Sequence, residues 1–409
     1  MRKGAIHETR SMGRAPPIRK EREVVQMKKI HPKVEEAVDT LRLTPIARRR
    51  LLTGAGLASA SAAASALLAA CTSSQDKPAA SGGTGAAAAP GDFPATPKWK
   101  FVLVCHVTTN PFFTPTQYGA QDACALLGTE FQWTGSKDSI VAEMVNACNT
   151  AISAKADGLA VAVVDKAAFR DPVNRALDAG IPVVSYNADG ARDDKGTSRL
   201  AYIGQGLYES GYALGRRALQ QVDSGEVVGF IATPGALNIQ PRIDGAQQAI
   251  KDSGKPVRFT PVGTNADVTK GLSIIDAYAQ GHANLAGMLA VDAGSTQSIG
   301  QTVKKYNMRS KGLKVAGGFD LVPETLAAIK AGDLDYTIDQ QPYLQGFLPV
   351  LYLYLYKLSG GLLFPSETNT GLLFVTKDNV GPYQTTKTRF EGSDTAQKLV
   401  ERSGAIAHA

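Results

Sequence analysis

Several features are scarce in this 409-residue chain, and each scarcity excludes a class of protein. Four Cys are too few for a small domain that disulfides hold together. The five His show no spacing typical of a metal site, and neither a P-loop nor a Gly-x-Ser-x-Gly motif occurs. One long uncharged run occurs, before residue 71, so a protein with many membrane-spanning helices is excluded. The sequence therefore indicates no metal and no cofactor, although 44% hydrophobic residues suffice for two cores.

Positive charge is confined to the N-terminal end of the chain. The formal net charge is +7, but residues 1–70 contain 14 Lys and Arg against 6 Asp and Glu. The rest of the chain contains 30 basic against 31 acidic residues and is almost neutral. Because no general basic surface remains, the composition does not indicate a nucleic-acid partner.

Residues 1–70 have the order of a bacterial export signal, in which basic residues precede an apolar run and then small residues. Three arginines at positions 48–50 precede two leucines and an uncharged run. The run ends in Leu68-Ala69-Ala70-Cys71, which resembles the lipobox of bacterial lipoproteins, where the Cys thiol is acylated. We therefore predict that Cys71 becomes the lipidated N-terminus and anchors the protein to a membrane.

Two features of this signal stay open. Paired arginines are typical of twin-arginine export, but Leu51 and Thr53 stand where Phe and Lys are usual, so the general secretory route is an alternative. The long basic region leaves two candidate starts, Met1 and Met27. Residues 71–98 are rich in Ser, Gly, Ala and Pro and predict a flexible linker behind the lipidated Cys.

From Trp99 onward, apolar runs of strand length alternate with helical patterns. The expected strands are 101–105, 130–133, 158–164, 181–186, 227–231, 285–291, 315–319 and 337–338. Most of these runs lack polar alternation, which indicates parallel sheets with helices on both faces. The run at 351–356 alternates like a strand, yet leucines from Leu344 to Leu358 fall at helical spacing and predict a helix. The fold class is therefore α/β, with doubly wound sheets.

Polar and aromatic residues follow the carboxyl ends of several expected strands. The ends carry Asn110, Phe112, Phe113, Asn187, Asp189, Asp292, Asp320, Asp339 and Gln340. In doubly wound sheets, ligands bind beyond these ends. Amides and carboxylates hydrogen-bond several hydroxyls, and aromatic rings cover the C–H face of a sugar, so the set favours a polyhydroxylated ligand. Any one Asn or Asp could equally be a helix cap or a turn former.

Five short motifs then occur in the order and spacing of a known family. They are Asn110-Pro111-Phe112-Phe113, Gly180-Ile181-Pro182-Val183, Arg242-x-x-Gly245, Gly318-Phe319-Asp320 and Thr337-Ile338-Asp339-Gln340. Over residues 99–395 the chain resembles a periplasmic sugar-binding protein of the ribose-binding type, the soluble receptor of an ABC importer. The resemblance implies two Rossmann-like lobes that are joined by three crossings, near Gly204, Gln340 and Val375, with the ligand clamped between them.

The resemblance also implies lobe boundaries and ligand-binding residues. The N-terminal lobe is expected at 99–204 plus 341–374 and the C-terminal lobe at 205–340 plus 375–395, with a tail at 396–409. At the ligand the resemblance places Asn110, Phe112, Phe113, Asn187, Arg242, Asp292, Phe319, Asp320 and Gln340. Two departures argue against ribose: Asn187-Ala188 replaces the Asp-Arg of ribose binders, and Asn265-Ala266-Asp267 replaces an aromatic residue. We expect a different monosaccharide or sugar-like polyol.

The expected function is therefore that of a lipid-anchored substrate-binding protein in the cell envelope. The resemblance implies a monomer that closes on its ligand and delivers it to an ABC permease, without catalysis. An enzyme is disfavoured because Gly204-Gln205-Gly206 is followed by Glu209, where a dinucleotide loop has Gly. A sugar-sensing repressor would need a DNA-binding head in place of the export signal. A receptor that feeds a membrane sensor kinase or a chemoreceptor stays open.

The three Cys beyond the linker are expected to be free, buried thiols. Cys105 lies in the first strand, and Cys124 and Cys148 lie on the first two helices. With right-handed winding and strand order 2-1-3, these helices cover opposite faces of the sheet. Their thiols are then too far apart to form a disulfide.

Overall fold

The computed structural model describes residues 94–189, 197–362, 364–385 and 388–394. The export signal, Cys71, most of the linker and the tail at 396–409 lie outside these residues. Within them, two sheets of six strands each are present. No helix in the described ranges has both the length and the apolar character that crossing a membrane requires.

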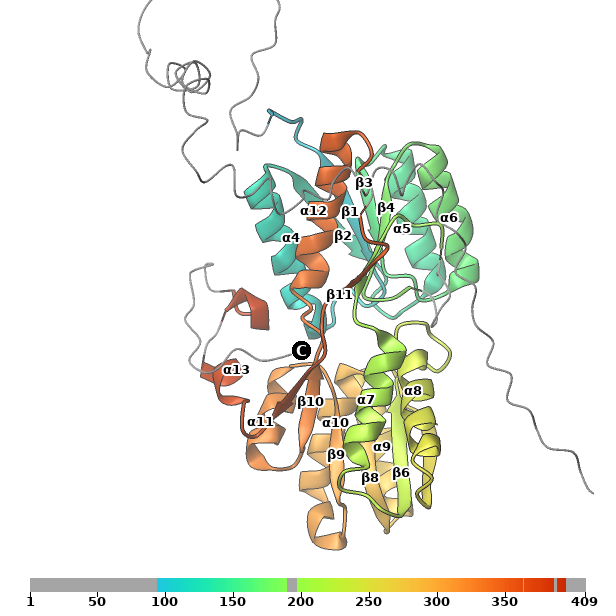
Figure 1. Cartoon of the computed structure of the whole chain (residues 1–409), viewed down its shortest axis with the longest axis vertical. Coiled ribbons are helices and arrows are strands. Elements are labelled where there is room, and N and C mark those ends of the chain that lie inside the picture. The colour runs from blue at the N-terminus through green and yellow to red at the C-terminus, as the bar shows by residue number, and fades with distance from the viewer. Residues whose placement is uncertain (1–93, 190–196, 363, 386–387, 395–409) are drawn as a thin grey trace, which may run out of the picture. The chain divides into compact units, whose positions relative to one another are not determined.

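The first sheet has the strand order β11-β5-β4-β3-β1-β2, and neighbouring strands run parallel. Its strands are β1 (Lys100–Cys105), β2 (Glu130–Gly135), β3 (Gly158–Val161), β4 (Val183–Tyr186), β5 (Tyr202–Gly204) and β11 (Glu367–Asn369). Its helices are α4 (Thr114–Leu127), α5 (Val141–Ser153), α6 (Lys166–Asp178) and α12 (Leu344–Ser359). In Figure 1, α4 and α12 lie side by side on one face of the sheet, and α5 and α6 lie on the other. These elements form the first lobe.

The second sheet has the order β12-β10-β9-β8-β6-β7, in which only β12 runs antiparallel to its neighbour. Its strands are β6 (Gly225–Ile231), β7 (Val257–Gly263), β8 (Leu285–Ala290), β9 (Val315–Phe319), β10 (Tyr336–Asp339) and β12 (Leu373–Thr376). Its helices are α7 (Leu207–Ala218), α8 (Gln240–Asp252), α9 (Val268–Gly281), α10 (Ala293–Lys305), α11 (Pro323–Ala331) and α13 (Gly381–Thr385). These elements form the second lobe. Short 3-10 helices η2 (Pro111–Phe113), η3 (Met308–Lys311) and η4 (Arg389–Glu391) complete the described fold.

The structure confirms the α/β fold class and several finer expectations. The strand order β2-β1-β3 is the expected 2-1-3, and Cys105, Cys124 and Cys148 are free and buried. The Leu- and Tyr-rich segment is the helix α12 despite its strand-like alternation. Strand β7 was not expected, because it is an edge strand whose half-buried, alternating pattern lacks the continuous apolar run of the central strands.

The chain crosses between the two lobes at three places. The first crossing follows Gly204 at the end of β5, and the second follows Asp339 at the end of β10. The third lies between Asn369 of β11 and Leu373 of β12, a few residues before the expected position near Val375. Residues 388–394 also differ from the expected boundary, because η4 packs against α4 of the first lobe.

Glycine permits two helix pairs to approach very closely. A Cβ atom on Gly346 of α12 would lie 1.8 Å from the carbonyl oxygen of Thr116 on α4. A Cβ atom on Gly245 of α8 would lie 2.2 Å from the carbonyl oxygen of Tyr208 on α7. The glycine of the Arg242-x-x-Gly245 motif therefore serves helix packing, and this packing fixes the position from which Arg242 extends.

Candidate functional site

The segment after β1 presents an amide and two aromatic rings. Asn110 caps η2, because its Oδ1 accepts a hydrogen bond of 3.0 Å from the backbone N–H of Phe112. The rings of Phe112 and Phe113 meet edge to face with centroids 4.7 Å apart. Phe113 is 1% exposed and also packs on His106 and Trp133. Phe112 thus lies at the border of an aromatic cluster, and Phe113 supports it from within.

Asn187 follows β4 in a left-handed conformation with φ of 62°. Asn adopts this region more easily than most residues. Its side chain is buried and its Nδ2 donates to Oε1 of Gln345 on α12, at 3.0 Å. Gln345 in turn donates through Nε2 to Gln340 and to Oγ1 of Thr370, each at 3.1 Å. Asn187 is therefore tied to the second and third crossings.

The hydrogen-bonded chain continues into the second lobe. Gln340, directly after β10, donates through Nε2 to Oδ1 of Asp320 at 2.6 Å. Asp320 follows β9 with φ of 76°, and Oγ1 of Thr337 donates to its carbonyl oxygen. One connected set of side chains thus runs from Asn187 to Asp320 across the second crossing.

Arg242 is a buried cation near the start of α8, with 3% of its surface exposed. Its Nη1 donates to the carbonyl oxygen of Val291 at 3.0 Å, and its Nη2 donates to Oε1 of Gln205 at 3.1 Å. The guanidinium carbon lies 4.0 Å from the ring centre of Phe319, so that ring face is occupied by the cation. Among the described residues, Nε of Arg242 has no hydrogen-bond partner. The guanidinium of Arg242 is thus held in place through its two Nη atoms, and its Nε is unpaired within the described ranges.

The two carboxylates of the second lobe differ in their contacts. Asp292 caps α10 through the backbone N–H of Ser295, at 2.8 Å, and accepts from the backbone N–H of Ala232 at 2.9 Å. Burial raises its pKa. Burial also raises the pKa of Asp320 to about 6, against the opposing effect of Arg242. Among the described residues no ion pair joins Arg242 and Asp320, although Arg242 is close enough to lower the pKa of Asp320.

His106 and Asn238 connect the two lobes at this level. His106 follows β1, and its Nε2 lies 3.1 Å from Nδ2 of Asn238 in the loop before α8. Beside this contact, the backbone N–H of Leu237 donates to the carbonyl oxygen of Val164 at 3.1 Å. Burial lowers the pKa of His106 to about 4, so its ring is neutral at pH 7. A neutral ring can accept from the Asn238 amide at Nε2 and keep its proton on Nδ1.

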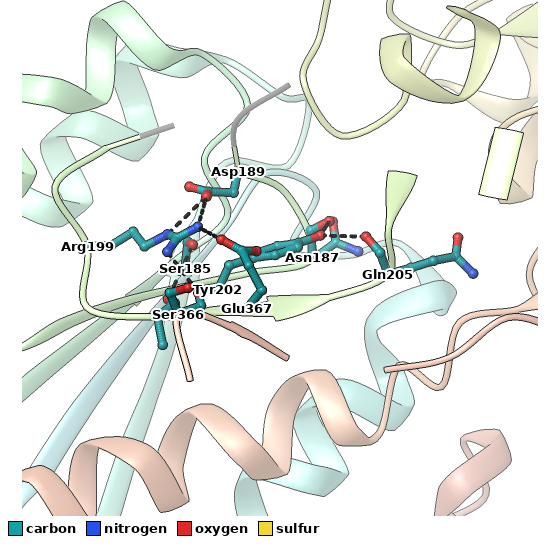
Figure 2. Close-up of polar contacts among 9 residues, drawn as sticks. Ser185, Asn187, Asp189, Arg199, Tyr202, Gln205, Ser366 and Glu367 are labelled. Carbon is teal, nitrogen blue, oxygen red and sulfur yellow. Dashed lines mark hydrogen bonds and ion pairs between the residues drawn. The ribbon is translucent and has the colours of Figure 1, made fainter. Parts of the chain in front are cut away.

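Arg199 forms a buried ion pair with Asp189, which lies two residues after Asn187 (Figure 2). Arg199, whose side chain is 1% exposed, contacts Asp189 and Glu367 at 2.6 Å each, both through Nη2. Its Nη1 donates to the carbonyl oxygen of Ser366 at 2.9 Å. Arg199 therefore ties the segment after β4 to β11, just before the third crossing.

Tyr202 completes this arrangement beneath the first crossing (Figure 2). Its hydroxyl lies 3.2 Å from the carbonyl oxygen of Asn187 and 3.1 Å from that of Gln205. The side chain of Gln205 donates to the carbonyl oxygen of Gly371 at 2.9 Å. The residues that orient Asn187 and Arg242 thus come from all three crossings.

Several of these residues were not predicted from the sequence. Gln205 was noted only as part of a failed dinucleotide motif, and His106 only as one of five His without the spacing of a metal site. The missed members are His106, Arg199, Gln205, Asn238, Gln345 and Thr370. The one available signal was the position of His106 directly after an apolar strand. Gln and Thr carry no comparable signal, because they are ordinary residues of helices and loops.

The assembled groups suit binding and not catalysis. Amides, a guanidinium and carboxylates can donate to and accept from several hydroxyls at once. In the described part of the chain, no cluster of three or more His, Cys, Asp or Glu could hold a metal ion.

Comparisons with known proteins agree with this geometry. A family model described as the periplasmic binding protein domain matches residues 101–360. XylF of Sulfolobus acidocaldarius, a xylose/arabinose-binding protein, is 48% identical over 318 residues, which are 75% of this chain and 78% of XylF. The ribose import binding protein RbsB of Salmonella typhimurium is 24% identical over 255 residues, which are 61% of this chain and 81% of RbsB.

Two solved structures of carbohydrate-binding proteins are also similar to this chain. A carbohydrate transporter protein from Acidothermus cellulolyticus in complex with myo-inositol is 28% identical, with a TM-score of 0.64, covering 72% of this chain and 100% of that one. An ABC transporter solute-binding protein from Burkholderia graminis in complex with D-arabinose is 26% identical, with a TM-score of 0.65, covering 71% and 99%. The chain belongs to the periplasmic binding protein family, in its two-lobed type I form, and is a binding protein and not an enzyme.

Proposed function

We propose that the protein is the substrate-binding component of an ABC importer and that it captures a pentose, D-xylose or L-arabinose, between its lobes. The observation that carries the proposal is the connected polar set from Asn187 of the first lobe to Asp320 of the second. Its specificity for a pentose is supported by the 48% identity to a xylose/arabinose-binding protein.

The proposed roles follow from the hydrogen-bonding groups and ring faces that each side chain can present to a ligand. The unused Nε donor of Arg242 and the Asp320 carboxylate are suited to sugar hydroxyls, in charge-assisted hydrogen bonds. Asn110 and Asn187 add amides from the first lobe, and Phe112 can cover the C–H face of the ring. The other proposed site residues, Phe113, Asp292, Phe319 and Gln340, lie directly beside these groups and hold them in place.

Capture is proposed to proceed by hinge closure about the three crossings. A ligand that touches both lobes stabilises the closed state by its differential contacts, since an open cleft offers only one set of partners. The three crossings are hydrogen-bonded to one another: Gln205 donates through Nε2 to the carbonyl oxygen of Gly371, and Thr370 donates through Oγ1 to the carbonyl oxygen of Gln340. Closure is therefore expected to change these hydrogen bonds. No chemical step is needed, and a monomer suffices.

Calorimetric titration of the full chain tests the ligand. We expect D-xylose or L-arabinose to bind with micromolar or tighter affinity, which corresponds to about −8 kcal/mol or better. D-Ribose, D-glucose and myo-inositol serve as comparison ligands. Absence of heat with both pentoses would exclude the proposed specificity. Uptake of labelled pentose by a strain that lacks the protein then separates an importer from a receptor that feeds a sensor kinase.

A lipid anchor at Cys71 is the proposed means of retention in the cell envelope. The support is the sequence Leu68-Ala69-Ala70-Cys71 and the Ser-, Gly- and Pro-rich linker that follows. The native protein should partition into the detergent phase of a Triton X-114 separation, and Cys71→Ser protein should stay in the aqueous phase. Equal partitioning of the two would refute the anchor.

A further inference from the structure

The described residues that follow β12 contact both lobes in turn. Val380 is buried in the core of the second lobe, and Nε2 of Gln384 donates to the carbonyl oxygen of Leu326 on α11 at 3.4 Å. Farther along, η4 packs against α4 of the first lobe. We refer to residues 377–385 and 388–394 as the C-terminal strap. It connects α11 of one lobe with α4 of the other.

Arg389 anchors the strap on the first lobe. Its Nε donates to Oδ2 of Asp122 at 3.0 Å, and its Nη2 donates to Oε1 of Gln121 at 2.8 Å. Its guanidinium carbon lies 4.1 Å from the ring centre of Tyr118. The Arg389 and Asp122 side chains are only 13% and 21% exposed, and Asp122 also accepts from the hydroxyl of Tyr343 at 2.8 Å. The anchor is therefore a partly buried, multiply bonded ion pair and not a loose surface contact.

The strap also lies beside the proposed ligand site. Phe390 packs edge to face on Tyr343 with ring centroids 4.5 Å apart. A cavity of about 50 Å³ is lined by Phe112 and Pro115 of the first lobe, Val322 and Pro323 of the second, and Phe390 of the strap. The strap thus adjoins the contact between the lobes next to Phe112, which is one of the proposed ligand residues.

We propose that the strap is a fourth connection between the lobes and that it slows ligand release by resisting their opening. The inference rests on the proposed hinge closure. When α4 moves away from α11 by more than the chain between Thr385 and Thr388 can span, the strap must lose one of its two attachments. The end at η4 is held by Arg389 and by the ring of Phe390, whereas Val380 and α13 belong to the second lobe's core region, so we expect the contacts of Arg389 and Phe390 to break first.

The rate of ligand release is the sensitive quantity. The strap contacts described above join parts of the protein to one another and not to a ligand, so they are expected to stabilise the closed state equally with and without ligand. Affinity then changes only to the extent that the free protein is open, but every release event requires the anchor to break. Removal of the anchor should therefore accelerate dissociation even where the change in affinity is small.

The kinetic test uses the full chain loaded with whichever of D-xylose and L-arabinose binds. Displacement is followed by stopped-flow fluorescence, which Trp133 in the aromatic cluster can report. Arg389→Ala should release the sugar about tenfold faster, a change of about 1.4 kcal/mol in the barrier. Arg389→Lys keeps the charge but not the planar fork and should fall between. Arg309→Ala is the matched control, because its ion pair with Asp335, at 2.8 Å, lies within the second lobe; it should release sugar at the native rate.

A second measurement needs no ligand. Spin labels on keto amino acids at positions 125 and 324, which are exposed on α4 and α11, report the separation of the lobes by electron–electron resonance. Arg389→Ala should give longer and broader distances than the native chain, and Arg309→Ala should not. Native distances together with native release rates in Arg389→Ala would overturn the proposal. If neither pentose binds the native chain, the proposed function fails, while the distance measurement still decides on the strap.

Discussion

The carboxylate of Asp320 should lower the stability of the free protein at neutral pH. The side chain is 5% exposed, and burial raises its pKa from 3.8 to about 6. Each unit of pKa shift corresponds to about 1.4 kcal/mol between the two protonation states, so the charged form costs about 3 kcal/mol in the folded chain. Arg242 reduces this cost without removing it.

The direction of the pH dependence follows from proton binding. The folded chain keeps a proton on Asp320 up to a pKa of about 6, whereas the unfolded chain releases it near the ordinary value of 3.8. Between these values the folded state binds more protons, so the free energy of unfolding falls as pH rises through this window. The cost is fully present above pH 6 and is absent below the unfolded pKa.

Asp320→Asn removes the charge and keeps an oxygen that can accept from Gln340. Without ligand, the free energy of unfolding of the Asp320→Asn variant should exceed that of the native chain by up to about 3 kcal/mol at pH 7.5. The two values should be equal near pH 4. Urea unfolding across this range measures the difference, with Asp378→Asn, a change at an exposed carboxylate, as control. The same variant should bind pentose at least about tenfold more weakly at pH 7.5, because a charged acceptor is lost. Parallel stability curves for native and Asp320→Asn protein would refute the reasoning.

Three further predictions concern neighbouring groups. Arg242→Lys should weaken pentose binding by roughly tenfold or more in calorimetry, because an ammonium cannot reproduce the stacked planar fork that holds Val291 and Gln205. The native chain should lose stability as the pH falls from 6.5 towards 4, because His106 has a folded pKa of about 4 and only the unfolded state gains its proton in this range. His106→Gln should abolish this loss, which is up to about 3 kcal/mol in urea unfolding. Gly245→Ala should lower the free energy of unfolding by about 2 kcal/mol, because the new methyl group meets the backbone of α7; an unchanged thermal midpoint would contradict this packing.

The central strands could be predicted from the sequence because their physics is local. A strand that is covered on both faces needs a continuous apolar run, and β1, β8 and β9 have one. Polar residues at the carboxyl ends of such strands then share one edge of their sheet. This is why Asn110 and Asn187 are expected at one edge of the first sheet, and Asp292 and Asp320 at one edge of the second.

The third crossing was harder to predict because the two strands beside it are short. Strands β11 and β12 have three and four residues, and β11 reads Glu-Thr-Asn with no apolar pattern. Their pairing depends on β5 and β10, which are distant in the chain. The contact of Arg389 with Asp122 joins residues 267 positions apart, and no local signal could indicate it.

The role of Asp292 illustrates a different limit. The sequence allowed both a helix cap and a ligand contact, and the structure shows the cap, with both carboxylate oxygens accepting from backbone N–H groups. Asp320 has the same residue type at the same kind of strand end but accepts from a side-chain amide at the hinge. The different contacts of Asp292 and Asp320 therefore follow from their positions relative to the crossings, because the residue type is the same.

In the proposed site, a bound ligand would offset part of the cost of burying charged groups. Asp320 carries its charge at the expense of stability above pH 6, and Arg242 is buried with its Nε unpaired among the described residues. Sugar hydroxyls can donate to the first and accept from the second, and each such bond offsets a desolvation that folding alone leaves uncompensated. A neutral polyol is thus a better match than an anion or a cation, because its hydroxyls can donate to Asp320 and accept from Arg242 at the same time. Because the Asp320 charge exists only above its pKa, the stabilisation by pentose should be larger at pH 7.5 than at pH 5.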